Sequence, residues 1–172
     1  MVKHPVIEIS VRGLGVMKAE LYPEYAPATV KNFLSLIEKG FFDGLIFHRV
    51  IRGFMIQGGG YTENFDRRPA ALIKGEFAAN GFLTNTLKHT RGVLSMARTS
   101  DPDSASSQFF IMHKDAPHLD AQYAGFGKLT EGYEILDAIA AVKTCRIGGM
   151  ADFPREPVVI ESIRRTDVGE QA

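Results

Sequence analysis

Apolar and polar residues alternate along the first twenty positions of the chain. Ile7, Ile9 and Val11 are each separated by a charged or polar residue, which is the period of a half-buried β-strand. The glycine-containing stretch at residues 13–15 can turn the chain, and the alternation resumes over residues 17–21. The pattern therefore predicts a β-hairpin at the start of the chain.

Two segments show helical periodicity instead. A helix is expected from Pro27 to about Gly40, where apolar residues recur three and four positions apart and form one stripe. Proline suits the first turn of a helix and glycine its C-terminal cap. A second helix is expected from about Tyr133 to Val142, again with its apolar residues on one side.

The rest of the chain is typical of short strands between glycine and proline turns. They are expected at about residues 46–51, 54–57, 92–97, 107–112, 123–129 and 157–165. With the hairpin these make eight strands, which together with two helices indicate a closed antiparallel barrel. Periodicity alone does not distinguish a barrel from a sandwich. The irregular stretch 61–87 is either a functional loop or a packed surface loop.

Composition places the chain among ordinary globular proteins. Its 172 residues are 45% hydrophobic and 23% charged, which suits one domain over residues 1–172. Lys plus Arg and Asp plus Glu both number 20, so net charge gives no reason to expect nucleic acid or an anionic membrane as partner. The arginine pairs 67–68 and 164–165 are interpreted as solvated charges. A closed barrel with near-neutral charge favours a monomer.

Cysteine usage and the N-terminal residues bear on location. The one cysteine, Cys145, cannot form an internal disulfide, which fits a reducing compartment. The first residues lack the apolar core of a signal peptide, and no stretch approaches the roughly 18 apolar residues of a membrane span. A cytoplasmic location is therefore expected.

The candidate chemistry lies in three β-prone segments at residues 47–51, 54–60 and 107–112. They combine Phe, Met and Ile with one guanidinium, Arg49, and two carboxamides, Gln57 and Gln108. The three glycines at 58–60 are not a phosphate loop, because no Gly-Lys-Ser/Thr follows, and are interpreted as a bend or a close backbone approach. This set suits a reaction that needs shape and a few hydrogen bonds.

Other reaction classes lack their usual residues. A hydrolase is excluded because the serines at 95, 104, 106 and 107 have no convincing base as partner. His113 and His118, with Asp115 and Asp120 nearby, do not have the spacing of a standard metal site. No metal and no cofactor are therefore expected.

These segments resemble the cyclophilins, a family of peptidyl-prolyl cis–trans isomerases. The resemblance rests on Phe47–Gly59, Lys88–Ala97, Ser107–Ile111 and Phe126–Lys128, which follow one another in the family's order. Matches run from about Val6 to about Ile160, and the loop at 97–108 looks like that of the bacterial branch. The resemblance implies a mainly β fold, a closed eight-stranded antiparallel barrel with an α-helix capping each open end. It also implies a cofactor-free isomerase that assists protein folding.

The resemblance assigns the site residue by residue. Arg49 corresponds to the catalytic arginine, which would stabilise the twisted imide of an X–Pro bond. The residues that would bind the substrate are Phe54, Met55, Gln57, Ala97, Arg98, Gln108, Phe110, His118, Leu119 and Tyr123. Of these, Phe54, Met55, Phe110 and Leu119 correspond to the proline pocket, and the backbone of Ala97 and Arg98 would hold the peptide before the proline.

The alternation of side chains along each strand separates core-facing residues from groove-facing ones. Within their strand, Met55 and Gln57 share one face, opposite Ile56. By the same rule Phe109 and Ile111 are the better core candidates, and their neighbours Gln108 and Phe110 face the other way. A bulge at the start of the 54–57 strand could also swing Phe54 into the groove.

Three site positions depart from the commonest eukaryotic pattern. His118 stands where that branch has tryptophan, Tyr123 where it has histidine, and Arg98 where it has asparagine. The missing tryptophan implies weak binding of cyclosporin, and the missing histidine argues against an imidazole acid–base step. Arg98 at the rim suggests a preference for acidic residues before the proline. Expected partners are proline-containing peptides and unfolded chains, and the alternative is a binding or chaperone module with little turnover.

Overall fold

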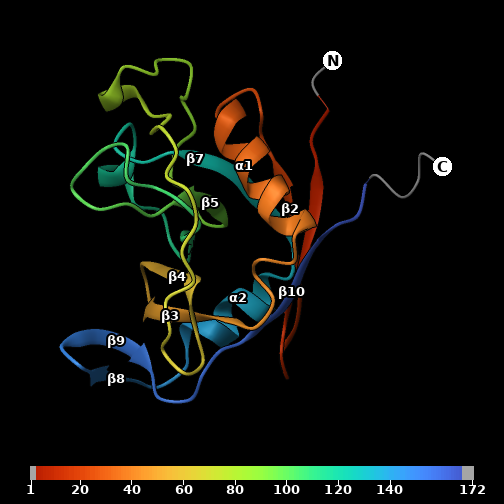
Figure 1. Ribbon diagram of the computed structural model, residues 1–172, viewed down its shortest axis with the longest axis vertical. Helices are drawn as coiled ribbons and strands as arrows, with labels where there is room; N and C mark the ends of the chain where they lie inside the picture. Colours follow the sequence, from red (N-terminus) through yellow and green to blue (C-terminus); the bar gives the residue numbers. More distant parts are fainter. Residues whose placement is uncertain (1–2, 168–172) are drawn as a thin grey trace.

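Eight strands form one antiparallel sheet that curves into a barrel (Figure 1). The computed structural model describes residues 3–167. The strands of this sheet are Val6–Val11 (β1), Gly15–Leu21 (β2), Leu45–Ile51 (β3), Met55–Thr62 (β4), Val93–Met96 (β5), Phe109–Met112 (β6), Gly125–Glu131 (β7) and Ile160–Arg165 (β10). Their order in the sheet is β10-β1-β2-β7-β5-β6-β4-β3. The predicted N-terminal hairpin is β1–β2.

The two outer strands of the sheet, β3 and β10, close the barrel. Ile46 forms an antiparallel bridge with Val159, just before β10. Gly44 N donates to Ile160 O at 2.8 Å, and Phe47 N donates to Val158 O at 3.0 Å. These bonds use backbone groups that an open sheet would leave unpaired at its edges. The prediction of an eight-stranded antiparallel barrel is confirmed, and the barrel is nearly closed.

The two helices pack at opposite ends of β2. Helix α2 (Tyr133–Ala140) packs where β2 begins, since a Cβ on Gly15 would lie 2.8 Å from Ile135. Helix α1 (Pro27–Glu38) follows the end of β2 and inserts Phe33 into the core. Both helices end one or two residues before their predicted ends. No helix in the described part of the chain is long and apolar enough to cross a lipid bilayer.

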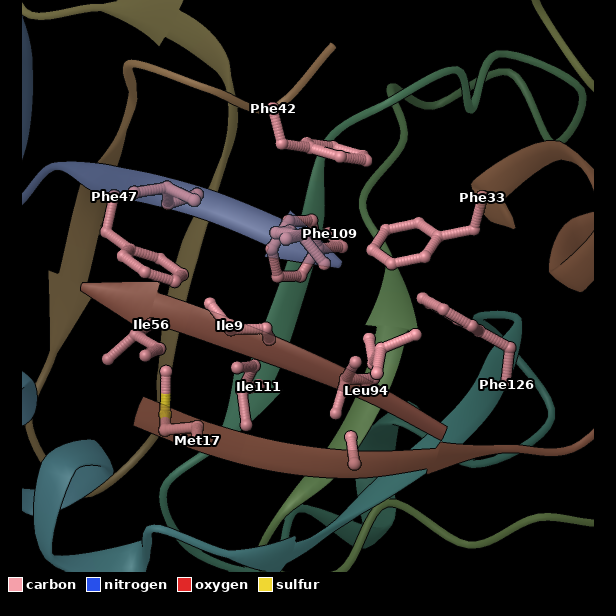
Figure 2. Packing of buried hydrophobic residues seen from close by; sticks show 14 of the residues in the cluster. Ile9, Met17, Phe33, Phe42, Phe47, Ile56, Leu94, Phe109, Ile111 and Phe126 are labelled. Atoms are coloured by element: carbon pink, nitrogen blue, oxygen red, sulfur yellow. The ribbon is translucent and has the colours of Figure 1, made fainter. Parts of the chain in front are cut away.

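Aromatic side chains fill the barrel interior (Figure 2). The ring of Phe33 packs against Phe42, Phe109 and Phe126 with centroid separations of 4.9, 5.3 and 5.0 Å. Phe109 and Ile111 are fully buried in this cluster, as their alternation predicts. Their neighbour Phe110 belongs to a second cluster. Strand β6 therefore has one face in the core and one face available for a site.

A second, two-stranded sheet was not predicted. Strands Thr144–Ile147 (β8) and Met150–Pro154 (β9) form a hairpin that projects from the barrel beside β3 (Figure 1). Its turn, Gly148-Gly149, has positive φ angles of 55° and 87°. Only the end of β9 is buried, where Phe153 packs on Ile46 of β3. These residues contain no apolar run, so the sequence gives little indication of a strand here. The strand predicted at residues 157–165 begins only at Ile160.

The long connection between β4 and β5 is fastened to helix α1 by Glu76. This buried carboxylate accepts hydrogen bonds from Thr29 N and Thr29 Oγ1, both at 2.7 Å. It thereby caps the N-terminus of α1, whose own N-cap residue, Ala26, provides no side-chain bond. The same connection includes a short 3₁₀ turn at Ala78–Asn80, and a second such turn, Pro117–Leu119, follows β6.

Candidate active site

A bulge in β3 turns Arg49 to the outside of the barrel. Phe47 points into the core and pairs with Gly58, whereas Arg49 pairs with Gln57, so two residues on β3 advance against one on β4. His48 is the extra residue, and beyond it Val50 returns to the core. Strict alternation would have aimed the arginine inward with Phe47. The bulge re-aims it, as bulges next to functional sites often do.

Arg49 begins a short chain of hydrogen bonds on the outer face. Its Nη1 donates to Gln57 Oε1 at 3.4 Å, and Gln57 Nε2 donates to Gln108 Oε1 at 3.0 Å. The side chain of Gln108 has room because Gly60 has none. A Cβ atom on Gly60 would lie 2.6 Å from Gln108 Cγ. The Arg49 side chain is exposed and has no ion-pair partner among the described residues. Its remaining donors are free for a ligand.

Beside Arg49 lies a small hollow of about 130 Å³ whose wall combines apolar and polar side chains. It is lined by Arg49, Phe54, Met55, Gln57, Ala97, Arg98, Phe110, Leu119 and Tyr123. Met55, Phe110 and Leu119 are buried and form one cluster, against which Phe54 and Tyr123 pack half-buried.

The hollow brings together nine of the eleven site residues expected from the sequence. The other two lie next to it. Gln108 lines an adjoining hollow, and the His118 ring stacks on Phe54 with the centroids 5.7 Å apart. A larger, open hollow of about 830 Å³, between Arg12 and Arg155, contains none of these residues.

Phe54 is held in place by a residue that sequence reasoning missed. Phe54 lies in the turn between β3 and β4, one residue before the strand in which it was expected. His113 N donates to Phe54 O at 2.9 Å, and Gly53 N donates to His113 Nδ1 at 2.9 Å. His113 Nε2 therefore carries the proton and donates to Asp137 Oδ1 on α2 at 3.0 Å. From the sequence, His113 suggests only a metal ligand, because nothing local relates it to residue 53.

A second buried histidine corrects the account of the serines. His89 Nε2 accepts from Ser95 Oγ at 2.8 Å, and His89 Nδ1 faces Asp120 Oδ1 at 3.2 Å. The expectation that Ser95 has no base as partner is therefore wrong. Ser95 is nevertheless completely buried, so no substrate can reach its hydroxyl. The His89 ring instead stacks beneath Phe110, with centroids 6.1 Å apart, and supports the floor of the hollow.

Arg98 is engaged within the protein rather than free at the rim. Its Nη2 and Nε donate to Gln122 O at 2.7 and 3.3 Å, and its Nη1 donates to Thr99 O at 2.9 Å. Its guanidinium carbon lies 4.8 Å from the centroid of Phe77 and 4.7 Å from that of Tyr123. These contacts fix the Tyr123 wall and leave Arg98 few donors for a ligand.

Two of the imidazoles around the hollow, those of His48 and His89, have lowered pKa values. Burial lowers the pKa of His48 to about 4, assisted by the positive charge of Arg49. Burial also lowers the pKa of His89, partly offset by its hydrogen bond to Asp120. The site therefore combines a permanent cation, two amides and a hollow with several apolar side chains in its wall. Such a set can bind and polarise a neutral group without a proton transfer.

Comparisons with known proteins agree on one family. The model of the cyclophilin-type peptidyl-prolyl cis-trans isomerase family matches residues 6–165. A peptidyl-prolyl cis-trans isomerase of Acinetobacter baylyi is 48% identical over 157 residues, covering 88% of this chain and 80% of that protein. Peptidyl-prolyl cis-trans isomerase B of Escherichia coli is 42% identical over 158 residues, covering 87% of this chain and 93% of its own.

A solved structure gives the same result. A cyclophilin-type isomerase of Cryptosporidium parvum, crystallised in the presence of the dipeptide Ala-Pro, has a TM-score of 0.77 and 30% identity. The similarity covers 94% of this chain and 98% of that one.

Proposed function

This chain belongs to the cyclophilin-type peptidyl-prolyl cis-trans isomerase family and is an enzyme of that class, and we propose that Arg49 supplies its catalytic donor. The barrier to rotation about a peptide bond is about 18–20 kcal/mol, because resonance makes the C–N bond partly double. In the twisted transition state that resonance is lost and the proline nitrogen regains a lone pair. A donor aimed at this lone pair stabilises the transition state more than either planar ground state.

The free guanidinium at the edge of the hollow is the observation that carries this assignment. Arg49 has donors to spare, and Gln57 holds one side of its fork at 3.4 Å. An arginine is charged at every physiological pH, so it can polarise the nitrogen without any proton transfer. The mechanism needs no nucleophile, which fits a site whose buried serine is inaccessible.

The apolar part of the hollow would hold the proline ring while the preceding carbonyl rotates. Phe54, Met55, Phe110 and Leu119 give it apolar walls, and burial of the ring there displaces water. Gln57, Gln108 and the backbone of Ala97 would hold the flanking peptide. The structural neighbour crystallised with Ala-Pro supports a proline-containing ligand for this fold.

The test is prolyl isomerisation of a chromogenic Ala-X-Pro-Phe peptide by the wild type and Arg49→Ala. We expect kcat/KM to fall by at least about tenfold, which corresponds to ~1.4 kcal/mol of transition-state stabilisation. Arg52→Ala is the matched control, because Arg52 is an exposed arginine in the neighbouring turn that does not line the hollow. Equal activity of Arg49→Ala and wild type, at equal thermal stability, would refute the assignment.

The natural substrates proposed are X–Pro bonds in unfolded or flexible chains, so that the enzyme assists folding. A refolding protein whose slow phase is an X–Pro isomerisation should lose that phase when the enzyme is added. If the wild type binds proline peptides without accelerating this phase or the peptide reaction, the chain is a binding module instead.

A further inference from the structure

The outer strand of the two-stranded sheet has a free edge. Strand β9 lies between β8 and β3, and β8 pairs with β9 alone (Figure 1). Within residues 3–167, β8 forms no backbone hydrogen bond outside its own hairpin. An unpaired edge of this kind can receive a further strand from another chain.

Thr144 presents its backbone groups at this edge. Arg155 N donates to Lys143 O at 2.8 Å, so these two residues form a hydrogen-bonded pair. Hydrogen-bonded and non-hydrogen-bonded pairs alternate along an antiparallel ladder, and the next pair is Thr144 with Pro154. Pro154 has no N–H to donate, which fits a non-hydrogen-bonded pair. The N–H and C=O of Thr144 therefore point away from β9, and Thr144 is exposed.

The strand at this edge is regular. Between the pairs Cys145–Phe153 and Ile147–Met150, β9 advances by three residues and β8 by two, so the bulge of the hairpin belongs to β9. Exposed and half-buried side chains alternate along the whole of β8. An added strand would therefore meet one exposed and one half-buried face.

The charge along the edge is positive. Lys143 stands immediately before β8 and Arg146 lies within it, and both are exposed. Neither has an ion-pair partner within residues 3–167, and Arg146 makes only a long bond of 3.4 Å to Gly149 O in its own turn. The nearest carboxylate of the hairpin, Asp152, lies on β9, one strand away from the edge. Both cations are thus available to a partner.

This charge decides which kind of strand fits. Two copies of the chain paired through β8 would bring the same cations together, which opposes self-pairing. A segment with Asp or Glu would instead face Lys143 and Arg146 with opposite charge. The half-buried side chains of Cys145 and Ile147 suit apolar neighbours on the other face. The matching segment therefore alternates carboxylates with apolar residues.

Beyond Lys143 the edge leads to the open hollow of about 830 Å³ described above. Lys143 and Arg155 line it without an ion-pair partner among the described residues, whereas Arg12 is engaged by two glutamates at 3.2 and 3.0 Å. One carboxylate, Glu156, belongs to the lining, and the exposed side chain of Leu14 adds apolar surface. A segment longer than β8 has room to continue there.

We infer that the β8 edge binds an extended, acidic segment of a partner protein by strand addition. No residue from 143 to 156 lines the proposed proline pocket, so a partner held here would leave Arg49 open to substrate. The inference does not depend on the proposed function. Because the ion pairs would be solvent-exposed, binding should weaken as salt is raised.

The probe is a short, proline-free peptide in which Glu alternates with Val. We expect its calorimetric affinity to fall at least about tenfold in the double variant Lys143→Glu/Arg146→Glu, because two attractions become repulsions. The same peptide with Lys in place of Glu should bind this variant better than the wild type. Lys31→Glu/Lys88→Glu is the matched control, because it changes net charge equally at two exposed lysines away from the hairpin, and it should keep the wild-type affinity.

Amide hydrogen exchange tests the geometry. Thr144 N–H should exchange rapidly in the free protein and become protected when the Glu-Val peptide is saturating. Undiminished prolyl isomerisation by both double variants would show that they are folded.

The inference is overturned if the wild type does not bind the peptide, or if the control variant weakens binding as much as the hairpin variant. Binding without protection of Thr144 would also overturn it, because the peptide would then be held by charge alone. A wild-type dimer in sedimentation without peptide, lost in the hairpin variant, would make a second copy the occupant and overturn the acidic partner. Since the probe lacks proline, none of these results bears on Arg49.

Discussion

The side chain of Arg49 reaches solvent because strand β3 bulges at His48. The positive charge of Arg49 also acts on the neighbouring imidazole of His48. The charge of Arg49 helps to lower the pKa of His48 to about 4, so this nearest imidazole is neutral throughout the range in which enzymes are usually assayed. The guanidinium itself does not titrate there. At the scale of the residue, the chemistry should therefore be insensitive to pH.

We expect kcat/KM of the wild type to change by less than about twofold between pH 6 and 9. The profile should be measured at constant ionic strength, with a thermal melt at each pH to exclude unfolding. A sigmoid centred near the ordinary histidine pKa of ~6.5 would contradict a mechanism based on Arg49 alone.

At the scale of the element, the β3–β4 turn depends on a partner sixty residues away. Gly53, with φ of 81°, donates to His113, and His113 N donates to Phe54 O. Asp137, which Arg91 holds bidentately at 2.8 and 3.0 Å, fixes the far side of the imidazole. This arrangement ties a wall of the proposed pocket to helix α2.

His113→Ala should lower kcat/KM by about three- to tenfold, the equivalent of one or two hydrogen bonds. The loss should appear mainly in KM, because a displaced Phe54 weakens binding of ground and transition states alike. His113→Asn should recover part of it, since its amide oxygen can still accept from Gly53. Steady-state kinetics of both variants, with thermal melts, provide the measurement. If His113→Ala has the same KM as the wild type, the histidine contributes to stability alone.

At the scale of the whole molecule, buried histidines make stability depend on pH. The folded-state pKa of His48 is about 4, below its value near 6.5 in an unfolded chain. Between those values the unfolded state binds a proton that the folded state does not, so stability falls as pH drops from about 6.5 to 4. His89, whose pKa is also lowered, acts in the same direction.

We expect the free energy of unfolding to decrease by about 3 kcal/mol over this window on account of His48. Urea titrations at pH 7, 6, 5 and 4.5 would measure the slope. His48→Phe is the informative variant, because the buried Nδ1 has no hydrogen-bond partner among the described residues and Phe keeps the ring packing against Tyr61. An unchanged slope in this variant would contradict the assignment.

The sequence by itself determined the features that depend on the local spacing of apolar residues. Alternation identified the first hairpin, placed Phe109 and Ile111 in the core and turned Phe110 away from it. Helical spacing located both helices to within a few residues. Motif order identified the family, and with it the barrel and most of the residues that line the hollow. These features depend on neighbours a few positions apart, which are visible in a linear chain.

Tertiary structure alone decided which distant residues meet. The bulge that turns Arg49 outward exists only in the pairing of β3 with β4. The Glu76 cap on α1 and the His113 clamp on Gly53 join residues 47 and 60 positions apart. The β8–β9 hairpin buries too few side chains to produce an alternation of apolar and polar residues in the sequence. Likewise, Arg98 and Arg49 are both single arginines in strand-like segments of the sequence. Only the contacts among the described residues show that the donors of Arg98 are engaged and that most of those of Arg49 are not.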